Sequence, residues 1–320
     1  MNKQFFMARP LMILMLLLLS ALSVLIGVKD IDFLQLGSRD VYIILISRLP
    51  RLISIIVAGS SIGITGLIMQ TITKNKFVSP TTAGTVQWTR LGILVAILFF
   101  GGESHFTKMS VAFAFSLFGS FLFIGLLSRI KVKNAVLIPL IGLMLGSVVS
   151  AITTYFAYHY DLVQNMSSWL QGDFSLITKG RYELLYLGIP FLIIGYLFAD
   201  KFTIAGMGGD FARNLGLKYE QVVAVGLVIV SMITAVVTVT VGALPFLDLI
   251  VPNIVSMAKG DNLKNSLLDT ALIGTNFVLA CDILGRVLLF PYEIPIGMIV
   301  SVSGSAIFLW MIFRRSQHAV

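Results

Sequence analysis

The stretch that decides the fold is RLPRLISIIVAGSSIGITGLIMQTITKNK, residues 48–76. Its central part, residues 52–73, runs for 22 residues without a charge. At about 1.5 Å rise per residue, a helix of that length crosses a hydrocarbon core of about 30 Å. Two arginines and a proline stand before it, two lysines follow it, and glycines lie within it. A plain membrane anchor needs none of these, so the stretch predicts a membrane helix with further tasks.

The rest of the chain has the same apolar character. Its 320 residues are 57% hydrophobic and 12% charged, with a mean hydropathy of +0.96. Because a soluble domain carries about 25% charged residues, this composition predicts an all-α polytopic membrane protein. The net charge of +8 lies mainly in short loops between apolar runs, which indicates membrane topology rather than nucleic-acid binding.

Apolar runs with few charges predict about ten transmembrane helices. They cover residues 10–28, 52–73, 83–100, 109–128, 135–158, 183–199, 221–242, 246–258, 266–285 and 295–313. With the N-terminus inside, 14 basic residues fall inside and 8 outside, and Arg90 within the third run completes the 23. This bias predicts a multi-pass protein of the cytoplasmic membrane with both termini in the cytoplasm. The first run resembles a signal peptide, but its length favours a retained helix.

The sequence shows no motif for covalent chemistry. The lone Cys281 excludes an intramolecular disulfide and a cysteine metal cluster, and the three histidines are scattered. No GxxxxGK[ST] phosphate loop is present. We therefore expect no catalytic residue, no metal site and no cofactor, and any ATP hydrolysis should belong to a separate subunit.

Small residues in the opening stretch share one helix face. Ala58, Gly59, Gly63 and Gly66 are spaced by one, three or four residues, and Gln70 continues the row. Glycines at this spacing let two helix backbones approach closely, which makes ordinary helix packing their simplest role. A transport pathway along the same face is the alternative.

Two connections are longer than turns. Residues 159–182 predict a short amphipathic or irregular element, and residues 200–220, DKFTIAGMGGDFARNLGLKYE, predict a loop that opens a short helix. In the second connection Asp210 is a candidate N-cap, and Gly216 is the expected end of the helix.

Several motifs in order carry a family resemblance. They are RLPR, GxxxG and NKFVSP within residues 48–80, GGDFARNLGL (208–217), PFLDLIVPNIVSMAKGDN (245–262) and CDILGRVLLFPYEIPIGMIVSVSGSAIFLWMIFRR (281–315). Together they resemble the permease family of ABC importers for iron chelates and cobalamin. NKFVSPTTAGT, VPNIVSM and CDILGR look most similar to ferric-siderophore permeases of the catecholate type. The resemblance implies one transmembrane domain over residues 1–320 with the type II ABC importer permease fold.

The resemblance also implies partners and the residues that meet them. A permease of this family pairs with a second permease subunit, alike or different, above two ATPase subunits, and receives its cargo, here a ferric siderophore, from a substrate-binding protein. Matched by motif, binding-protein docking falls to Arg48, Arg51 and Arg286, whose guanidinium groups suit carboxylates. The ATPase coupling region, about residues 203–220, would engage through Asp210, Ala212, Arg213, Leu215 and Gly216. The plain alternatives are interfacial arginines and a surface helix.

A charged residue inside a predicted span is costly and marks a function or a partner. Arg90 is such a residue, and we predict that it attracts an anionic chelate along the pathway, or else pairs with a buried carboxylate such as Asp282. The predicted pathway residues are Gly59, Gly63, Gly66, Gln70, Gln87 and Arg90. Asp248 departs from the family pattern, which has glycine there, and needs a hydrogen-bond partner.

The sequence leaves two rival functions open. A permease of the same family could carry cobalamin or haem instead of an iron chelate. An ion-coupled secondary transporter is the rival from another class, and it would need charged residues inside the spans. Arg90 and Asp282 are nearly the only such residues among the predicted runs, and no internal repeat is evident, so the importer permease is the stronger prediction.

Overall fold

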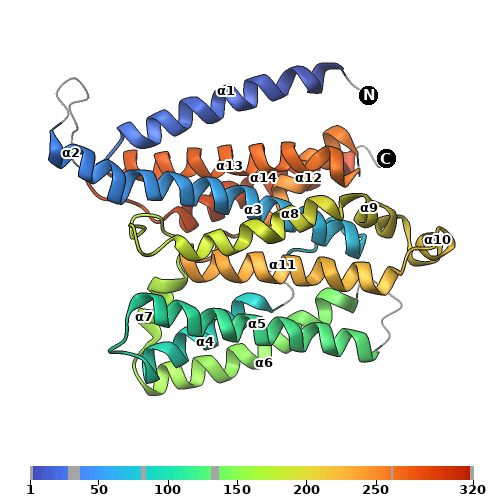
Figure 1. The fold of residues 1–320 in the computed structure, drawn as a ribbon, viewed down its shortest axis with the longest axis horizontal. Helices are drawn as coiled ribbons and strands as arrows, with labels where there is room; N and C mark the ends of the chain where they lie inside the picture. Colours follow the sequence, from blue (N-terminus) through green and yellow to red (C-terminus); the bar gives the residue numbers. More distant parts are fainter. Residues whose placement is uncertain (1–2, 28–36, 81–83, 131–136, 261, 318–320) are drawn as a thin grey trace.

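Residues 3–27, 37–80, 84–130, 137–260 and 262–317 are described by a computed structural model, and they are mostly helical (Figure 1). The long helices are α1 (Lys3–Leu25), α3 (Leu49–Thr73), α5 (His105–Ile130), α6 (Leu137–His159), α11 (Tyr219–Val241), α13 (Leu263–Val287) and α14 (Ile296–Gln317). The shorter elements are α2 (Ser38–Ile43), η1 (Ile44–Arg48), α4 (Thr85–Phe99), α7 (Val163–Leu170), η3 (Glu183–Leu187), α8 (Gly188–Leu197), α9 (Ala199–Met207), α10 (Gly209–Asn214) and α12 (Leu247–Lys259). Within the described ranges the β structure is limited to an isolated bridge between Gln171 and Ala243, which confirms the all-α class.

Within the described ranges, six helices are long and apolar enough to cross a membrane, or up to seven if the bent pair Glu183–Leu197 and Ala199–Met207 forms one span. Each of the ten predicted apolar runs contains a helix, but the count of ten spans is not confirmed. Among the shorter helices, α4 has 15 residues and α12 has 13, whereas a full crossing takes about 20.

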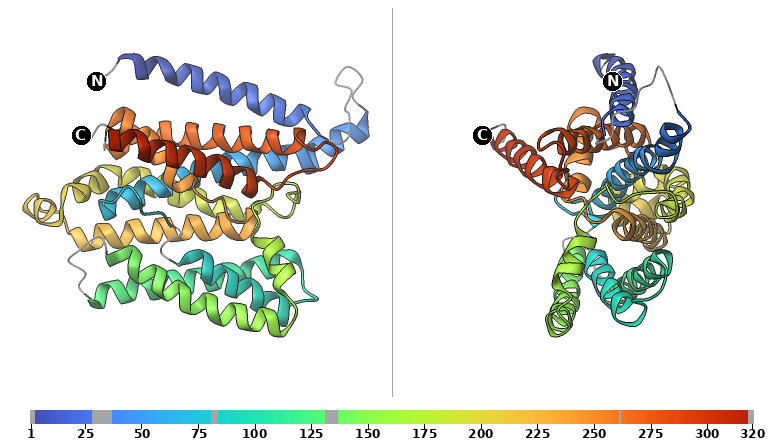
Figure 2. Two further views of the ribbon diagram at one scale, coloured as in Figure 1. Left: turned by 180° about the vertical axis from the view of Figure 1, so that it is seen from behind. Right: turned by 90° about the vertical axis from the view of Figure 1, so that its left-hand side faces the viewer.

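The helices run along the long axis of the molecule (Figure 1). Both termini and α10 lie at one end, called here the α10 end, and α2 and α7 lie at the opposite end, called the α2 end. Helix α3 lies in the middle and packs against α11, α12 and α13. Helices α4, α5 and α6 gather at one edge and α1 lies at the other (Figure 2).

Helix α3 reaches its neighbours through the predicted glycine face. A Cβ atom added to Gly59 would lie 2.9 Å from the Cα of Thr275, and one added to Gly274 would lie 2.4 Å from the carbonyl oxygen of Gly59. At Gly66 an added Cβ would lie 1.9 Å from the carbonyl oxygen of Asp248. These distances leave no room for a side chain, so the glycines set the approach of α3 to α13 and α12.

A short irregular connection separates α11 from α12. Helix α11 ends before Gly242, whose φ of 92° suits glycine, and α12 begins after Phe246 at φ 64°. Two backbone hydrogen bonds hold this connection to the segment at the end of α7. The amide of Ala243 donates to the carbonyl oxygen of Leu170 over 2.9 Å, and the amide of Asp173 donates to the carbonyl oxygen of Val241 over 3.0 Å. Irregular backbone is tolerated at membrane depth where protein satisfies its polar groups, and such breaks commonly surround a binding cavity.

Candidate functional site

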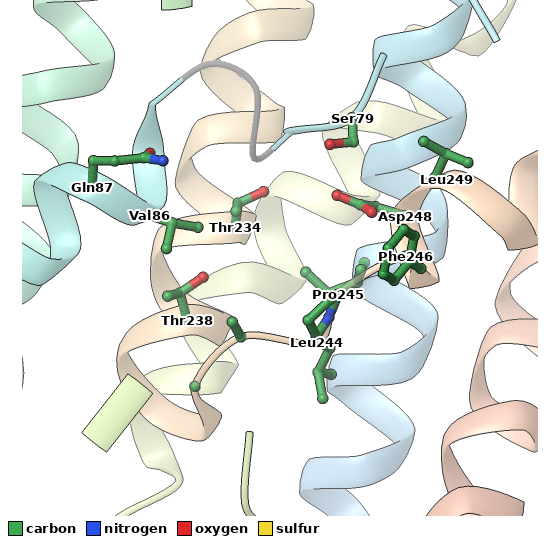
Figure 3. A pocket seen from close by; sticks show the side chains of 13 residues that line it. Ser79, Val86, Gln87, Thr234, Thr238, Leu244, Pro245, Phe246, Asp248 and Leu249 are labelled. Atoms are coloured by element: carbon green, nitrogen blue, oxygen red, sulfur yellow. The ribbon is translucent and has the colours of Figure 1, made fainter. Parts of the chain in front are cut away.

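A cavity of about 330 Å³ lies where these helices break. Its walls come from α3, α4, α11, α12 and the connection between α11 and α12 (Figure 3). Its polar lining residues are Ser79, Gln87, Thr234, Thr238 and Asp248. Asp248 is 4% exposed, so a carboxylate stands inside the bundle beside hydroxyl and amide groups.

The predicted pathway residues separate into two groups. Gln87 lines the cavity, and its amide oxygen is buried without a hydrogen-bond partner in the described part of the chain. The glycines of α3 lie instead at helix contacts, where Gly63 faces Thr270 of α13. Gln70 is 2% exposed and donates to the carbonyl oxygen of Leu249 over 3.2 Å, which links α3 to α12. Helix packing therefore explains the small residues of α3, whereas Gln87 is the predicted pathway residue that lines the cavity.

Arg90 lies on α4 and is half-buried. It lines a recess of about 450 Å³ with Ser167, Leu170 and Gln171 from the end of α7. Its Nε–H has no hydrogen-bond partner among the described residues. The alternative partner Asp282 is bound to other arginines, so Arg90 keeps the accessibility that its predicted pathway role needs.

Arg48 is buried, with 7% exposure. Its Nη1 donates to the carbonyl oxygens of Val24 and Leu25 over 2.5 and 3.0 Å. The last four carbonyl groups of a helix have no hydrogen-bond donor within the helix. Arg48 donates hydrogen bonds to two of these carbonyls at the C-terminus of α1.

Arg286 holds the same end of α1 from the other side. It is 5% exposed and donates from Nη1 to the carbonyl oxygens of Ser23 and Ile26 over 2.7 and 3.0 Å. It also pairs with Asp282 one turn earlier on α13. As they stand, Arg48 and Arg286 face α1 rather than a docked protein.

Arg51 completes this cluster at the α2 end. Its guanidinium pairs with Asp282 over 2.8 Å and with Glu293 over 2.7 Å. Its side chain is 13% exposed, and that of Glu293 is 24% exposed, so this pair forms the accessible part of the cluster. Docking at the three predicted arginines stays a prediction, and Arg51 is the one best placed for it.

The predicted coupling segment forms a protrusion at the α10 end (Figure 1). Helix α10 spans Gly209–Asn214 and closes at Gly216 with φ 78°, as the sequence predicts, although its N-cap is Gly208 rather than Asp210. Arg213 pairs with Asp210 over 3.0 Å and with Glu220 over 2.6 Å, and its hydrogen bond to Glu220 raises its pKa.

The exposed groups on α10 differ from those expected. Ala212 is fully buried within the subunit and does not face outward. Leu215 is 60% exposed and Phe211 is 49% exposed, and Phe211 was not among the predicted coupling residues. The sequence signal that could have identified Phe211 was an apolar aromatic residue in the first turn of a short helix that also carries charged residues. The segment therefore exposes Phe211 and Leu215, whereas Ala212 packs against the rest of the subunit.

A second buried cluster, which the sequence did not predict, lies between α1, α12 and α13. Asp269 on α13 is fully buried and pairs with Arg9 of α1 over 2.7 Å and with Lys259 of α12. The available signal was an acidic residue inside the predicted run 266–285, which is costly without a cationic partner.

A bundle of membrane-crossing helices, with broken helices around a polar cavity, is the architecture of a transport protein. The chain belongs to the FecCD transport family, whose model matches residues 10–314. The family predicted from the motifs is thereby confirmed. The members compared below are transport permeases, not enzymes.

The chain is 59% identical to the petrobactin import system permease protein YclN of Bacillus subtilis, over 96% of this chain and 98% of the relative. It is 40% identical to the ferric-anguibactin transport system permease protein FatD of Vibrio anguillarum, with the same coverage. A vitamin B12 import permease, BtuC of Yersinia enterocolitica, is 29% identical over 83% of this chain and 80% of its own length.

Among solved structures, the chain resembles a metal-chelate type ABC transporter in an inward-facing conformation. The TM-score is 0.84 at 24% identity, and the match covers 95% of this chain and 97% of the other. The fold is therefore that of an ABC transporter permease.

Proposed function

We propose that this chain is the transmembrane permease subunit of an importer that moves a ferric siderophore across the cytoplasmic membrane. The similarity to YclN along 96% of the chain carries the proposal. Petrobactin is accordingly the first siderophore to test. Cobalamin is the second candidate, because a B12 permease is a more distant relative at 29% identity.

The importer would need partners for energy and for delivery. A second permease subunit would complete the pathway, two ATPase subunits would bind at the α10 end, and a substrate-binding protein would dock at the α2 end. This arrangement puts both termini in the cytoplasm. The exposed side chains of Phe211 and Leu215 support an ATPase-binding site at α10, called here the ATPase seat. Exposed apolar groups on a protrusion outside the membrane favour contact with another protein.

Transport would then proceed by alternating access. ATP-driven closure of the ATPases would move α10, and the helices around the pathway would change between discrete packings. No step involves covalent chemistry in this chain.

Uptake in a strain that lacks the gene tests the cargo. Cells that carry the chain with its cognate partners should accumulate ⁵⁵Fe from ferric petrobactin, and cells without it should not. Radiolabelled cobalamin and a ferric hydroxamate serve as comparison cargoes. Uptake of cobalamin without uptake of any ferric siderophore would reject the proposed cargo.

A matched pair of substitutions tests the ATPase seat. Leu215→Asp should abolish co-purification of the ATPase and uptake, because it places a charge in an apolar contact. Leu176→Asp makes the same change at a residue of equal exposure, 62% against 60%, at the other end of the bundle, and should leave the ATPase bound. Equal loss in both variants would contradict the assignment of the seat to α10.

A further inference from the structure

Arg90 of α4 is a charged residue inside the bundle that the proposed function leaves without a task. No carboxylate of the described residues pairs with it, and its buried Nε–H donates no hydrogen bond there. Because an arginine without a counter-charge is costly inside a membrane protein, such residues face a partner or a water-filled cavity. Arg90 faces a recess of about 450 Å³, which it lines with Ser167, Leu170 and Gln171.

The other polar groups of this recess come from α7 and the residue that follows it, and both are hydrogen-bond donors. Among the described residues, neither the Ser167 hydroxyl nor the Gln171 side-chain amide has a hydrogen-bond partner. A guanidinium group adds a planar set of N–H donors that matches two oxygens of one acidic group. The recess therefore gathers donors around a positive charge, which is the arrangement that binds an oxyanion.

Contacts of the backbone and of an aromatic pair fix the end of α7 and leave the Gln171 side chain available. Trp169 donates from Nε1 to the carbonyl oxygen of Val239 on α11 over 3.2 Å. Its ring stacks on that of His105 at the start of α5, with ring centroids 5.1 Å apart. Gln171 itself forms the backbone bridge with Ala243. Since these contacts hold the donors in place before a ligand arrives, binding costs less conformational entropy.

The charged neighbours of the recess also favour an anion. Asp173 follows Gln171 by two residues, but its carboxylate already accepts hydrogen bonds from the amide and the hydroxyl of Ser175 over 2.7 and 2.8 Å. Lys108 and Arg181 lie within electrostatic range of the His105 ring, at the same end of the bundle. Positive charges around a recess raise the local concentration of anions.

The recess adjoins the polar cavity at the connection between α11 and α12. Val86 lines the cavity, and Arg90 follows one helical turn later on the same face of α4. Gln171 lines the recess, and its bridge partner Ala243 lines the cavity. Helix α4 runs from the cavity toward the α2 end, where α5 begins beside α7 (Figure 1). A cargo that enters from the α2 end therefore meets the recess before the cavity.

We propose that Arg90, Ser167 and Gln171 form an oxyanion site, and that an acidic group of the ferric siderophore occupies it on the way to the cavity. The identity of the occupant rests on the proposed function, which supplies the cargo. A chelate of the catecholate type holds Fe³⁺ through negatively charged oxygen atoms, so it presents oxyanion groups to such a site. Arg90 supplies the charge, and the amide and hydroxyl of α7 and its end supply neutral donors.

Chemical labelling of arginines tests the site in the full chain, purified with any subunits that remain bound, in nanodiscs of zwitterionic lipid. Phenylglyoxal reacts with accessible guanidinium groups, and mass spectrometry of peptides separates the labelling rate of Arg90 from that of the exposed Arg181 in the same sample. Inorganic phosphate or ferric petrobactin is titrated in at constant ionic strength. We expect each to slow the labelling of Arg90 in a saturable way, by about threefold or more, and to leave that of Arg181 unchanged.

A matched pair of variants assigns the protection to the recess. Gln171→Leu removes one donor and keeps Arg90, so protection by phosphate should require a several-fold higher concentration. Gln164→Leu makes the same change at an exposed residue of α7 outside the recess and should be protected as the wild type is. The labelling rate of Arg90 without ligand shows whether either variant has lost its fold.

The oxyanion site is overturned if phosphate slows the labelling of neither arginine or of both equally, or if Gln171→Leu is protected as well as Gln164→Leu. Protection by phosphate without protection by ferric petrobactin overturns the place of the cargo in the site. Nanodiscs that contain phosphatidylglycerol separate a lipid source. If that lipid alone protects Arg90 and neither phosphate nor the chelate adds to the effect, a lipid headgroup is the occupant and the proposal fails. None of these readouts measures uptake, so ⁵⁵Fe accumulation in the deletion strain decides the proposed function separately.

Discussion

Helix α13 carries a buried aspartate near each end, and both aspartates belong to clusters that hold α1. At the α10 end Asp269 receives Arg9 from α1 and Lys259 from α12. At the α2 end Asp282 instead orients Arg286, which grips the backbone carbonyls of α1. One cluster binds a side chain of α1 and the other caps its terminus.

The difference between the two clusters shows how a helix with few packing partners is held in place. Helix α1 lies at the edge of the bundle and packs mainly on α13, and its leucines at positions 11, 14, 17 and 18 are exposed. In a membrane, lipid tails solvate leucine as well as protein does, so apolar contact alone does not fix its position. Polar contacts at its two ends specify where it sits.

Substitution of Asp282 should destabilise the protein more than any other change in the two clusters. Asp282→Asn leaves Arg51 and Arg286 buried beside each other without the shared carboxylate. Breaking a buried ion pair by removing one partner costs about 3–5 kcal/mol, so the variant should unfold at a clearly lower temperature or denaturant concentration. The measurement is the unfolding midpoint of purified protein in detergent.

Glu293→Gln is the matched control for Asp282→Asn. It removes the other carboxylate of Arg51, but Glu293 is partly exposed and water can replace it. The loss should be well below that of Asp282→Asn. If both variants lost the same stability, the burial of Asp282 would not add to the strength of its ion pairs.

Asp269→Asn should have the second largest effect. Arg9 and Lys259 lose their shared acceptor, but their side chains are 23% and 15% exposed and can be partly rehydrated. The expected cost is about 1–3 kcal/mol, that of a buried hydrogen-bonding group left unsatisfied. The same unfolding midpoint measures it, and a cost above that of Asp282→Asn would reverse the order of the two clusters.

Arg48→Ala should loosen the C-terminus of α1 at a cost of about 1–2 kcal/mol. It removes the donors to Val24 and Leu25, while Arg286 still holds Ser23 and Ile26. Hydrogen–deuterium exchange of a peptide that covers residues 20–27 should become faster, and exchange near Arg9 should stay unchanged. Faster exchange at both ends would mean that the two clusters are coupled.

These clusters also show what the sequence could and could not predict. Each predicted apolar run contains a helix, and the glycines at 59 and 66 lie at close helix contacts, because both patterns are local and repeat at helical spacing. The burial of Arg48 and Arg286 was not predictable in this way. Their acceptors at the end of α1 lie 23 to 263 residues away in the sequence, and no local spacing rule predicts that these segments come together.

The functional residues divide along the same line. The start and end of α10 follow from Gly208 and Gly216, which are local signals, although the predicted N-cap Asp210 was wrong. Ala212 faces inward because of how α10 packs on the bundle, and Asp248 lines a cavity because of how α12 packs. Both depend on tertiary contacts, which the local sequence does not contain.

The smallest effect is expected for the ion pairs of α10. Arg213 pairs with Asp210 and Glu220 at the exposed surface, with side chains 52%, 99% and 70% exposed, so water solvates these charges well in any conformation. Arg213→Gln should therefore leave the unfolding midpoint unchanged. If it nevertheless reduces ATPase co-purification, the charge acts in the contact with that partner, since a role in folding would have moved the midpoint. If Arg213→Gln lowers the unfolding midpoint as much as Arg48→Ala does, solvent exposure does not determine how much each charged cluster contributes to stability.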